Sequence, residues 1–302
     1  MNASLQPKPL APLPEPRPPR NGRRLFDALL NLPGTLVTCT LVLFALGLVL
    51  FLSLRVNDGQ VLGSAFTLGN LSDALVDPLI RMVLLRSLLL AGLVTLVTVV
   101  LAYPVAYYLA FHAGSRRNLL LFLVSLPFWT SYLLRVFSWK IVLAYNGVLN
   151  SALLELGLIH TPITALLNTP SAVVITLAHA YAAFAVLPIY VSLTSVPGNL
   201  FEAAADLGAR PSQRFMRVIL PLSMPGVLSA ALVVFVPTVG DYVTPALVGG
   251  PSSTLIGSLI QSEFGKADDW PAGSAMAVVS MLAIGLVILL VRLLNKRWGS
   301  RT

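Results

Sequence analysis

Residues 196–221 read VPGNLFEAAADLGARPSQRFMRVILP, a polar stretch that separates two strongly apolar runs. Asn199 can cap a short helix that continues through Ala205, and Gly208 can close this helix in the left-handed conformation. Pro211 can open a second short helix because its fixed φ suits a first turn. At helical spacing, the apolar face of the first helix holds Leu200, Ala203, Ala204 and Leu207. This helix–turn–helix is either a docking surface for another protein or a plain amphipathic connector.

The runs on both sides of this stretch decide the class of protein. The chain has 302 residues, of which 56% are hydrophobic and 11% are charged, and its mean hydropathy is +0.84. Soluble domains average about 45–50% apolar and about 25% charged residues. So few charges cannot cover a soluble protein of this size, which argues against a soluble enzyme, a disordered chain and a nucleic-acid-binding domain. We therefore expect a polytopic membrane protein whose outer surface faces lipid.

Six apolar runs are long enough to cross a bilayer, so the predicted fold class is all-α with six transmembrane helices. The first run, residues 36–54, contains no charge. At 1.5 Å per residue it spans roughly 29 Å, close to the hydrocarbon core of about 30 Å. The other runs cover about residues 83–111, 118–144, 171–195, 218–240 or 218–248, and 273–294.

The distribution of charge predicts the orientation of these helices. The chain carries 20 Lys and Arg against 12 Asp and Glu. If both termini are placed in the cytoplasm, most of the bases lie on the cytoplasmic side, as the positive-inside rule requires. The outer connections would then be loops with short helices, over residues 55–80, 145–170 and 249–272.

The sequence divides into three parts. Residues 1–34 are predicted to form a Pro-rich cytoplasmic tail and entry segment, in which residues 25–31 favour a short interfacial helix. Residues 35–295 form the six-helix transmembrane domain, which includes the loop 196–217. Residues 296–302 form a second cytoplasmic tail.

The loop also carries a short signature. Its members, in order, are Glu202, Ala203, Ala204, Gly208, Leu220 and Pro221. Their spacing resembles the EAA motif (E-A-A-x3-G-x9-I-x-L-P) of permease subunits in binding-protein-dependent ABC importers. Val218 stands where that motif has Ile, a change that keeps the β-branched shape.

Two further stretches resemble the spermidine/putrescine-type permeases among these importers. They are Pro127-Phe128-Trp129 with Leu134-Arg135, and Asp241-Tyr242-Val243-Thr244-Pro245. The resemblance covers roughly residues 36–294. It implies a transport subunit, not an enzyme, that carries polyamines or a related cationic solute across the bacterial inner membrane. One alternative is the same importer class with another organic solute. Another is an ion-coupled secondary transporter, for which we find no internal repeat.

The same resemblance implies the type I importer fold and a set of partners. A second six-helix permease, two ATPase subunits and a periplasmic solute-binding protein would complete the transporter, without nucleic acid. The six signature residues would couple this chain to an ATPase subunit. The sequence has no phosphate-binding G-x-x-x-x-G-K-[ST] loop, so ATP and magnesium would bind to the ATPase subunits. We expect this chain itself to hold no cofactor and no metal.

Polar groups within the spans are candidates for the substrate pathway because their burial is costly. Asp241 lies beside Tyr242 in a segment interrupted by Pro and Gly, and a carboxylate next to an aromatic ring suits a cationic amine. Asp241 could instead pair with Arg135 or Lys140, or lie at the membrane interface without a transport role. Trp129 and Arg135 are further pathway candidates, although Arg135 could also anchor a gate or form a structural ion pair.

Two other residues have less specific interpretations. His179 lies among alanines in the fourth apolar run, which favours a hydrogen-bonded structural histidine between closely packed helices. Cys39, the single cysteine, lies within the first apolar run and is predicted to be an inert packed thiol. No set of side chains suggests a catalytic site.

Overall fold

The computed structural model describes residues 20–57, 65–166 and 168–299, and this part of the chain is helical. The described residues contain no β-strand, only an isolated antiparallel bridge between Arg55 and Phe66. The predicted all-α class is therefore confirmed. The chain divides after Leu48 into two compact units. The predicted tails lie outside the described residues over 1–19 and 300–302.

The helix α1 (Arg20–Ser53) is continuous through Pro33. The prediction of a separate short helix over 25–31 is therefore wrong. A proline removes one backbone hydrogen bond, and a membrane helix tolerates such a loss within a long apolar segment. Cys39 is exposed on α1. The prediction of a packed thiol is also wrong, because an apolar sequence run does not distinguish a packed face from an exposed one.

The second unit is built from twelve helices in the described part of the chain. They are α2 (Gly69–Val76), α3 (Pro78–Phe111), α4 (Arg117–Ser125), α5 (Tyr132–Leu143), α6 (Val148–Glu155), α7 (Pro170–Thr194), α8 (Gly198–Asp206), α9 (Pro211–Arg214), α10 (Leu220–Val239), α11 (Val243–Val248), α12 (Ile256–Ser262) and α13 (Trp270–Gly299). A 3₁₀ segment, η2 (Leu126–Trp129), follows α4, and a π-helical turn, η4 (Phe215–Ile219), joins α9 to α10.

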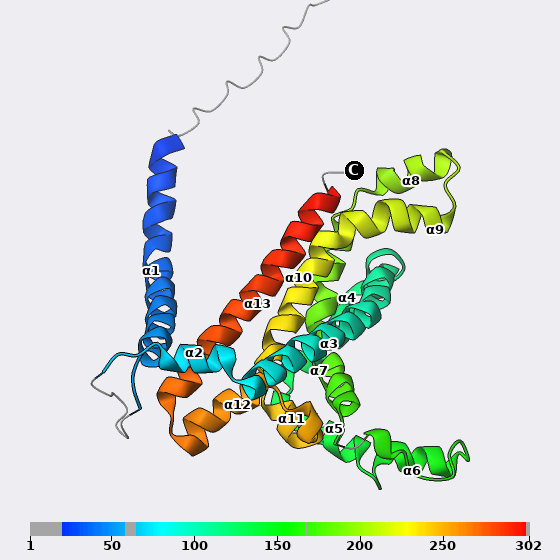
Figure 1. Cartoon of the computed structure of the whole chain (residues 1–302). Coiled ribbons are helices and arrows are strands. Elements are labelled where there is room, and N and C mark those ends of the chain that lie inside the picture. Colours follow the sequence, from blue (N-terminus) through cyan, green and yellow to red (C-terminus); the bar gives the residue numbers. More distant parts are fainter. Residues whose placement is uncertain (1–19, 58–64, 167, 300–302) are drawn as a thin grey trace, which may run out of the picture. The chain divides into compact units, whose positions relative to one another are not determined.

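The helices α3, α7 and α10 pack together at the centre of this unit (Figure 1). Leu109 of α3, Leu177 of α7 and Val234 of α10 are fully buried among them. A Cβ atom on Gly226 of α10 would lie 2.3 Å from the Cβ atom of Ser192 on α7. Glycine is needed at this crossing because any side chain would push the two helices apart.

Five helices in the described part are long and apolar enough to cross a membrane. Their spanning segments are Leu32–Ser53, Pro78–Phe111, Pro170–Thr194, Pro211–Val239 and Trp270–Leu293. A sixth span is present if Gly114–Trp129 and Tyr132–Glu155, which meet at 92°, are counted as one. The predicted third span, 118–144, is thus bent rather than straight. Pro127 lies just before the bend and cannot donate a backbone hydrogen bond.

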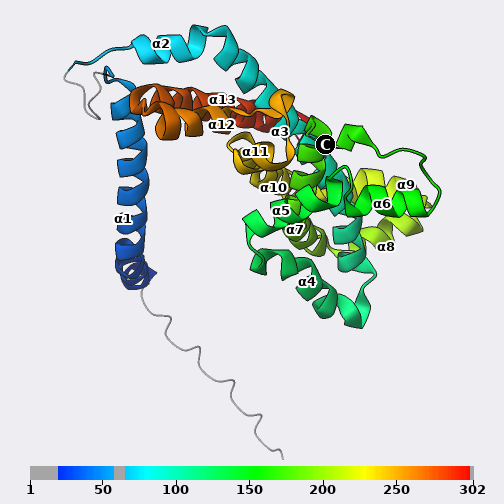
Figure 2. The same ribbon diagram turned by 90° about the horizontal axis from the view of Figure 1, so that it is seen from below.

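The two ends of the bundle carry different elements. The helices α8 and α9 lie at one end, together with the C-terminal ends of α3 and α13 (Figure 1). The helices α2, α11 and α12 lie at the other end, where α12 packs beside α13 (Figure 2). Part of the predicted outer loop 249–272 is core, because Leu255 and Ile256 are buried. The backbone amide of Ile256 donates to Ser87 Oγ on α3 at 2.7 Å, which draws this segment into the bundle.

Candidate functional site

The loop that carries the sequence signature forms two short helices at one end of the bundle. The helix α8 begins at Gly198, so Asn199, the predicted cap, lies inside the helix. Gly208 has φ +76°, which confirms the predicted left-handed turn. The amide of Ala209 donates to the carbonyl of Ala204 at 3.0 Å, as in a Schellman closure. The hydrogen bond and the left-handed Gly208 together explain why glycine stands four residues after Ala204 in the signature.

The second half of the loop leads directly into a spanning segment. Pro211 is the first residue of α9, as predicted, and the amide of Arg210 donates to Gln213 Oε1 at 2.9 Å. The helix then passes through the π-helical turn η4 into α10, whose first residues are Leu220 and Pro221. A π-turn inside a helix is uncommon and often marks a functional position.

An aromatic contact fixes this loop to the centre of the bundle. The ring of Phe215 lies 5.7 Å from the ring of Tyr103 and 6.0 Å from that of Tyr107, edge to face in both pairs. Tyr103 also shares a hydrogen bond of 2.9 Å with Ser223 of α10. Displacement of the loop would therefore act directly on α3 and α10.

No described residue covers the apolar face that was predicted for the first helix. Leu207 is 88% exposed, Leu200 and Ala203 are exposed, and Ala204 is half-buried. The side chain of Glu202 lies outside the described part. A leucine this exposed on a surface helix suits contact with another molecule.

A second group of predicted residues lies at the opposite end of the bundle. Asp241, 8% exposed, follows the end of α10. Its Oδ1 atom accepts from the amides of Val243 at 3.0 Å and Thr244 at 3.4 Å, which caps the start of α11. Its Oδ2 atom accepts from the hydroxyl of Tyr132 on α5 at 2.8 Å. Since that hydroxyl gives its proton to Asp241, Thr244 Oγ1 donates to the Tyr132 oxygen at 2.6 Å.

Arg135 stabilises the bend between η2 and α5. Its Nη1 atom donates to the carbonyl of Ala180 on α7 at 2.8 Å. Its Nη2 atom donates to the carbonyl of Pro127 and to both Thr130 oxygens, at 3.2 Å for the carbonyl and 3.0 Å for Oγ1. The carbonyl of Pro127 also accepts from the amide of Thr130 at 3.3 Å, so the guanidinium group adds donors to a turn that is already hydrogen-bonded. Arg135 is therefore bound to carbonyl groups, whereas the sequence suggested an ion pair.

The structure brings some of the predicted pathway residues together and leaves others apart. Asp241 and Arg135 are linked through the first turn of α5, because Tyr132 contacts Asp241 and lies one turn before Arg135. Trp129, by contrast, is 82% exposed, and Tyr242 is 48% exposed. These two aromatic side chains are open for contact with a solute or with another subunit.

The histidine predicted to be structural has a hydrogen bond in the structure. The indole nitrogen of Trp139 on α5 donates to His179 Nδ1 on α7 at 3.0 Å. This contact confirms a hydrogen-bonded His179. It also joins α5 to α7 on the helical face next to Arg135, so both ends of α5 are fixed.

Tyr132 and Thr244 are the residues of this cluster whose roles the sequence did not reveal. Tyr132 was visible only as one of several aromatic residues near the third span. Thr244 stands three residues after Asp241, a spacing at which a capped helix brings the two groups together. The contact between Tyr132 and Asp241 joins residues 109 positions apart, which no local pattern could indicate.

The sequence is similar to known transport proteins over most of its length. The sequence matches the family described as "Binding-protein-dependent transport system inner membrane component" over residues 102–300. It is 42% identical to the spermidine/putrescine transport system permease protein PotB of Escherichia coli (strain K12), over 80% of this chain and 88% of that protein. The PotB protein of Haemophilus influenzae is 38% identical, over 82% of this chain and 87% of that protein.

A solved structure with a similar fold supports the architecture. A crystal structure of a bacterial ABC transporter involved in the import of the acidic polysaccharide alginate contains a chain that matches with a TM-score of 0.65. The match covers 92% of this chain and 99% of that chain, at 17% sequence identity. At this identity the likeness shows the fold alone, which is the predicted type I importer permease fold.

Proposed function

The chain belongs to the family of binding-protein-dependent transport system inner membrane components, and on that basis we propose that it transports polyamines. It is a permease subunit of an ABC importer and not an enzyme. The observation that carries the proposed substrate is the 42% identity with a spermidine/putrescine permease over 80% of the chain. Another organic solute carried by the same importer class is the alternative.

The loop α8–α9 would couple this chain to an ATPase subunit. The exposed Leu207 and Ala203 offer an apolar surface, and Gly208 gives the turn that presents it. The contact of Phe215 with Tyr103 and Tyr107 offers a route from this surface to α3. ATP and magnesium would then be bound by the ATPase subunits, and the fixed loop would carry their movement into the bundle.

A binding-protein-dependent transporter of this family works with partner subunits. For this chain we infer a second permease, two ATPase subunits and a periplasmic solute-binding protein. The inner membrane is its location, and both termini would be cytoplasmic. The position of α8, α9 and the C-terminal end of α13 at one end of the bundle supports a cytoplasmic C-terminus (Figure 1). Arg210, Arg214 and Arg217 lie at the same end.

Acidic groups gather at the other end, where a cationic solute would enter. Glu263, Asp268 and Asp269 lie between α12 and α13. Partial burial and the neighbouring charge of Asp269 raise the pKa of Glu263 above its ordinary value. The same segment carries Lys266, so its net charge is negative, and such a charge raises the local concentration of cations. This distribution supports a polyamine more than an anionic solute.

Asp241 would help draw the polyamine into the outer half of the pathway, with Tyr242 and Trp129 as aromatic contacts and Arg135 holding the bend. The carboxylate of Asp241 accepts three hydrogen bonds, and a carboxylate has room for about four. A passing ammonium group could therefore still bind. Two unit charges 4 Å apart attract by about 4 kcal/mol at an effective dielectric constant of 20, and by less in a wet passage.

Uptake by the reconstituted transporter tests both the substrate and this residue. Proteoliposomes that contain the full complex should accumulate labelled spermidine or putrescine when the solute-binding protein and ATP are supplied. Asp241→Asn keeps the shape and the cap on α11 but removes the charge, so uptake should be slower. Tyr132→Phe is the matched control, because it removes a bond to Asp241 and leaves the charge in place.

The results separate the two hypotheses. If the solute-binding protein binds a sugar or an anion and ignores polyamines, the proposed substrate is wrong. If polyamines are transported but Tyr132→Phe slows uptake as much as Asp241→Asn, Asp241 acts through the stability of the α5–α11 contact. Its assignment to the pathway would then be wrong.

A further inference from the structure

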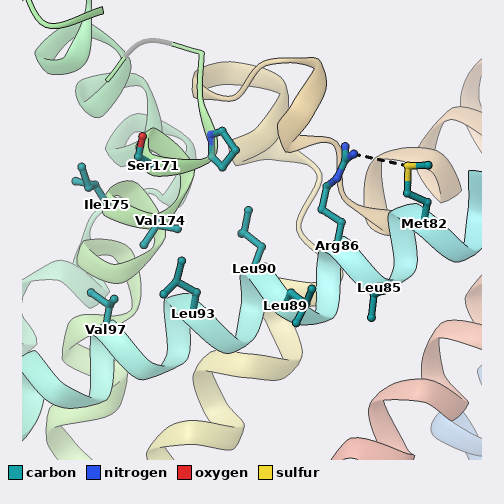
Figure 3. A pocket seen from close by; sticks show the side chains of 11 residues that line it. Met82, Leu85, Arg86, Leu89, Leu90, Leu93, Val97, Ser171, Val174 and Ile175 are labelled. Atoms are coloured by element: carbon teal, nitrogen blue, oxygen red, sulfur yellow. Dashed lines mark hydrogen bonds between the residues drawn. The ribbon is translucent and has the colours of Figure 1, made fainter. Parts of the chain in front are cut away.

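An apolar groove of about 650 Å³ lies between α3 and the first turns of α7, away from the signature loop (Figure 3). Leu90, Leu93 and Val97 of α3 face Val174 and Ile175 of α7 across it. Met82, Leu85 and Leu89 continue the apolar surface along α3 and are exposed. The groove is of the size of small-molecule sites, which are about 300–1,000 Å³.

One charged side chain lies in the lining of this groove. Arg86 projects from α3 toward the loop before α12 (Figure 3). With the described residues, its guanidinium group makes two contacts that are long for hydrogen bonds. Nη1 lies 3.5 Å from the carbonyl of Pro251, and Nη2 lies 3.8 Å from Met82 Sδ. A guanidinium group has five N–H donors, so this one keeps capacity for an anion.

The depth of Arg86 along α3 places it at the level of lipid headgroups. The helix has 34 residues, which is about 51 Å at 1.5 Å per residue. If a hydrocarbon core of about 30 Å is centred on α3, Arg86 lies about 13 Å from the midplane, close to the core boundary. A long basic side chain at this depth reaches the headgroup region.

The length of the groove fits one leaflet. From Arg86 to Val97 the groove follows α3 for eleven residues, about 16 Å. Half of the hydrocarbon core is about 15 Å. The groove therefore runs from the headgroup level to the middle of the membrane, with its only basic lining residue at the headgroup end.

The side chains of the groove distinguish a lipid from a protein partner. Helix–helix contacts in membranes are enriched in small residues such as Gly, Ala and Ser, which let backbones approach closely. Nine of the eleven lining residues are Leu, Val, Ile, Met or Arg, and none of those on α3 is Gly, Ala or Ser. Large, flexible aliphatic side chains that line a groove of this volume suit contact with an acyl chain.

We propose that this groove binds an anionic phospholipid, with one acyl chain between α3 and α7 and the headgroup phosphate on Arg86. The lipid would fill a surface that the second unit leaves open and would neutralise a guanidinium group at the membrane boundary. On the cytoplasmic side of membranes, basic pockets between transmembrane helices bind anionic headgroups, and the same pairing of charges would act here at the outer end of α3. A lipid held here would brace the outer half of α3 against α7.

Lipid competition on the intact transporter tests this proposal. The full-length chain is purified with its partner subunits in mild detergent and stripped of lipid. It is then exposed to equal amounts of phosphatidylglycerol and phosphatidylcholine, and the retained lipids are counted by native mass spectrometry. The wild type should retain phosphatidylglycerol in preference. Arg86→Gln should lose roughly fivefold of that preference, the ratio expected for one basic residue near an anionic surface.

Three further variants make the outcome specific. Arg86→Lys keeps the charge and should keep most of the preference. Arg81→Gln removes an exposed charge on the same helix outside the groove and should leave the preference unchanged. Val174→Trp fills the groove and should reduce the retention of both lipids.

Several results would overturn the proposal. A wild-type transporter without preference for phosphatidylglycerol would exclude an anionic site. An equal loss in Arg81→Gln and Arg86→Gln would show that general surface charge, not the groove, attracts the lipid. A cysteine placed at Leu93 that crosslinks to a partner subunit would show that protein covers the groove.

Discussion

The turn at Gly208 offers the sharpest test of how the α8–α9 loop works. Gly208 has φ +76°, in the region that side chains with a Cβ atom avoid. No heavy atom lies within 4 Å of the place where a Cβ atom would be added. A substitution there meets no steric overlap within the described chain. Any loss must therefore arise from the backbone conformation or from contact with a partner.

The structure gives the magnitude of the backbone effect. For residues with a Cβ atom the left-handed conformation costs roughly 1–2 kcal/mol, and a β-branched residue lies at the upper end. A cost of about 2 kcal/mol lowers the population of the turn about 30-fold relative to its alternatives. Gly208→Val should therefore reduce transport strongly, whereas Gly208→Asn should reduce it little because Asn enters this region more easily.

The assay is uptake together with ATP hydrolysis in the reconstituted transporter. With Gly208→Val we expect slow uptake and ATP hydrolysis that no longer responds to the solute-binding protein, although the chain still inserts. Wild-type transport by Gly208→Val would refute the docking role of the turn. If Gly208→Asn is as harmful as Gly208→Val, the bulk of the side chain against a partner is responsible, and the backbone argument is wrong.

Two further predictions concern the packing of the bundle. Arg135→Gln should lower the melting temperature of the detergent-solubilised protein, since hydrogen bonds to a charged group contribute about 1.5–3 kcal/mol each. Arg135→Lys should recover only part of the lost stability because Lys lacks the planar guanidinium fork. An unchanged melting temperature in Arg135→Gln would show that the bend does not depend on these hydrogen bonds. Gly226→Ala should cost about 1–3 kcal/mol of stability because its Cβ atom would overlap Ser192, whereas Gly92→Ala, with no neighbour within 4 Å, should be close to neutral. Equal melting temperatures for these two alanine variants would contradict the close crossing of α7 and α10.

The features that the sequence predicted well have local causes. Long apolar runs, the left-handed Gly208 and the helix start at Pro211 each follow from a few adjacent residues. The start of α8 was misplaced by two residues, because a cap at Asn199 predicts Leu200 as the first helical residue and the helix begins at Gly198. Helix ends are set by small differences in hydrogen bonding, and errors of one or two residues there are common.

The features that the sequence missed depend on distant contacts. The run 118–144 has Pro127, Thr130 and Ser131 near its middle, but the sequence does not show that Arg135 donates to the carbonyls of Pro127 and Thr130 at a bend there. The burial of Leu255 and Ile256 depends on α3, where Ser87 accepts the amide of Ile256. Hydropathy alone cannot show which apolar loop residues find such partners.

The two charged residues at the outer half of the bundle share one structural property. Asp241 accepts hydrogen bonds from backbone amides at the start of α11, and Arg135 donates to carbonyls at the end of η2. Irregular backbone at membrane depth requires such partners, so each charge has a structural reason to be present. A transport role must therefore be shown by a change of charge that leaves these hydrogen bonds intact. Asp241→Asn meets that condition for the cap on α11, because the amide oxygen can still accept from Val243, and Tyr132→Phe controls for the hydrogen bond from Tyr132 that the Asn nitrogen cannot accept.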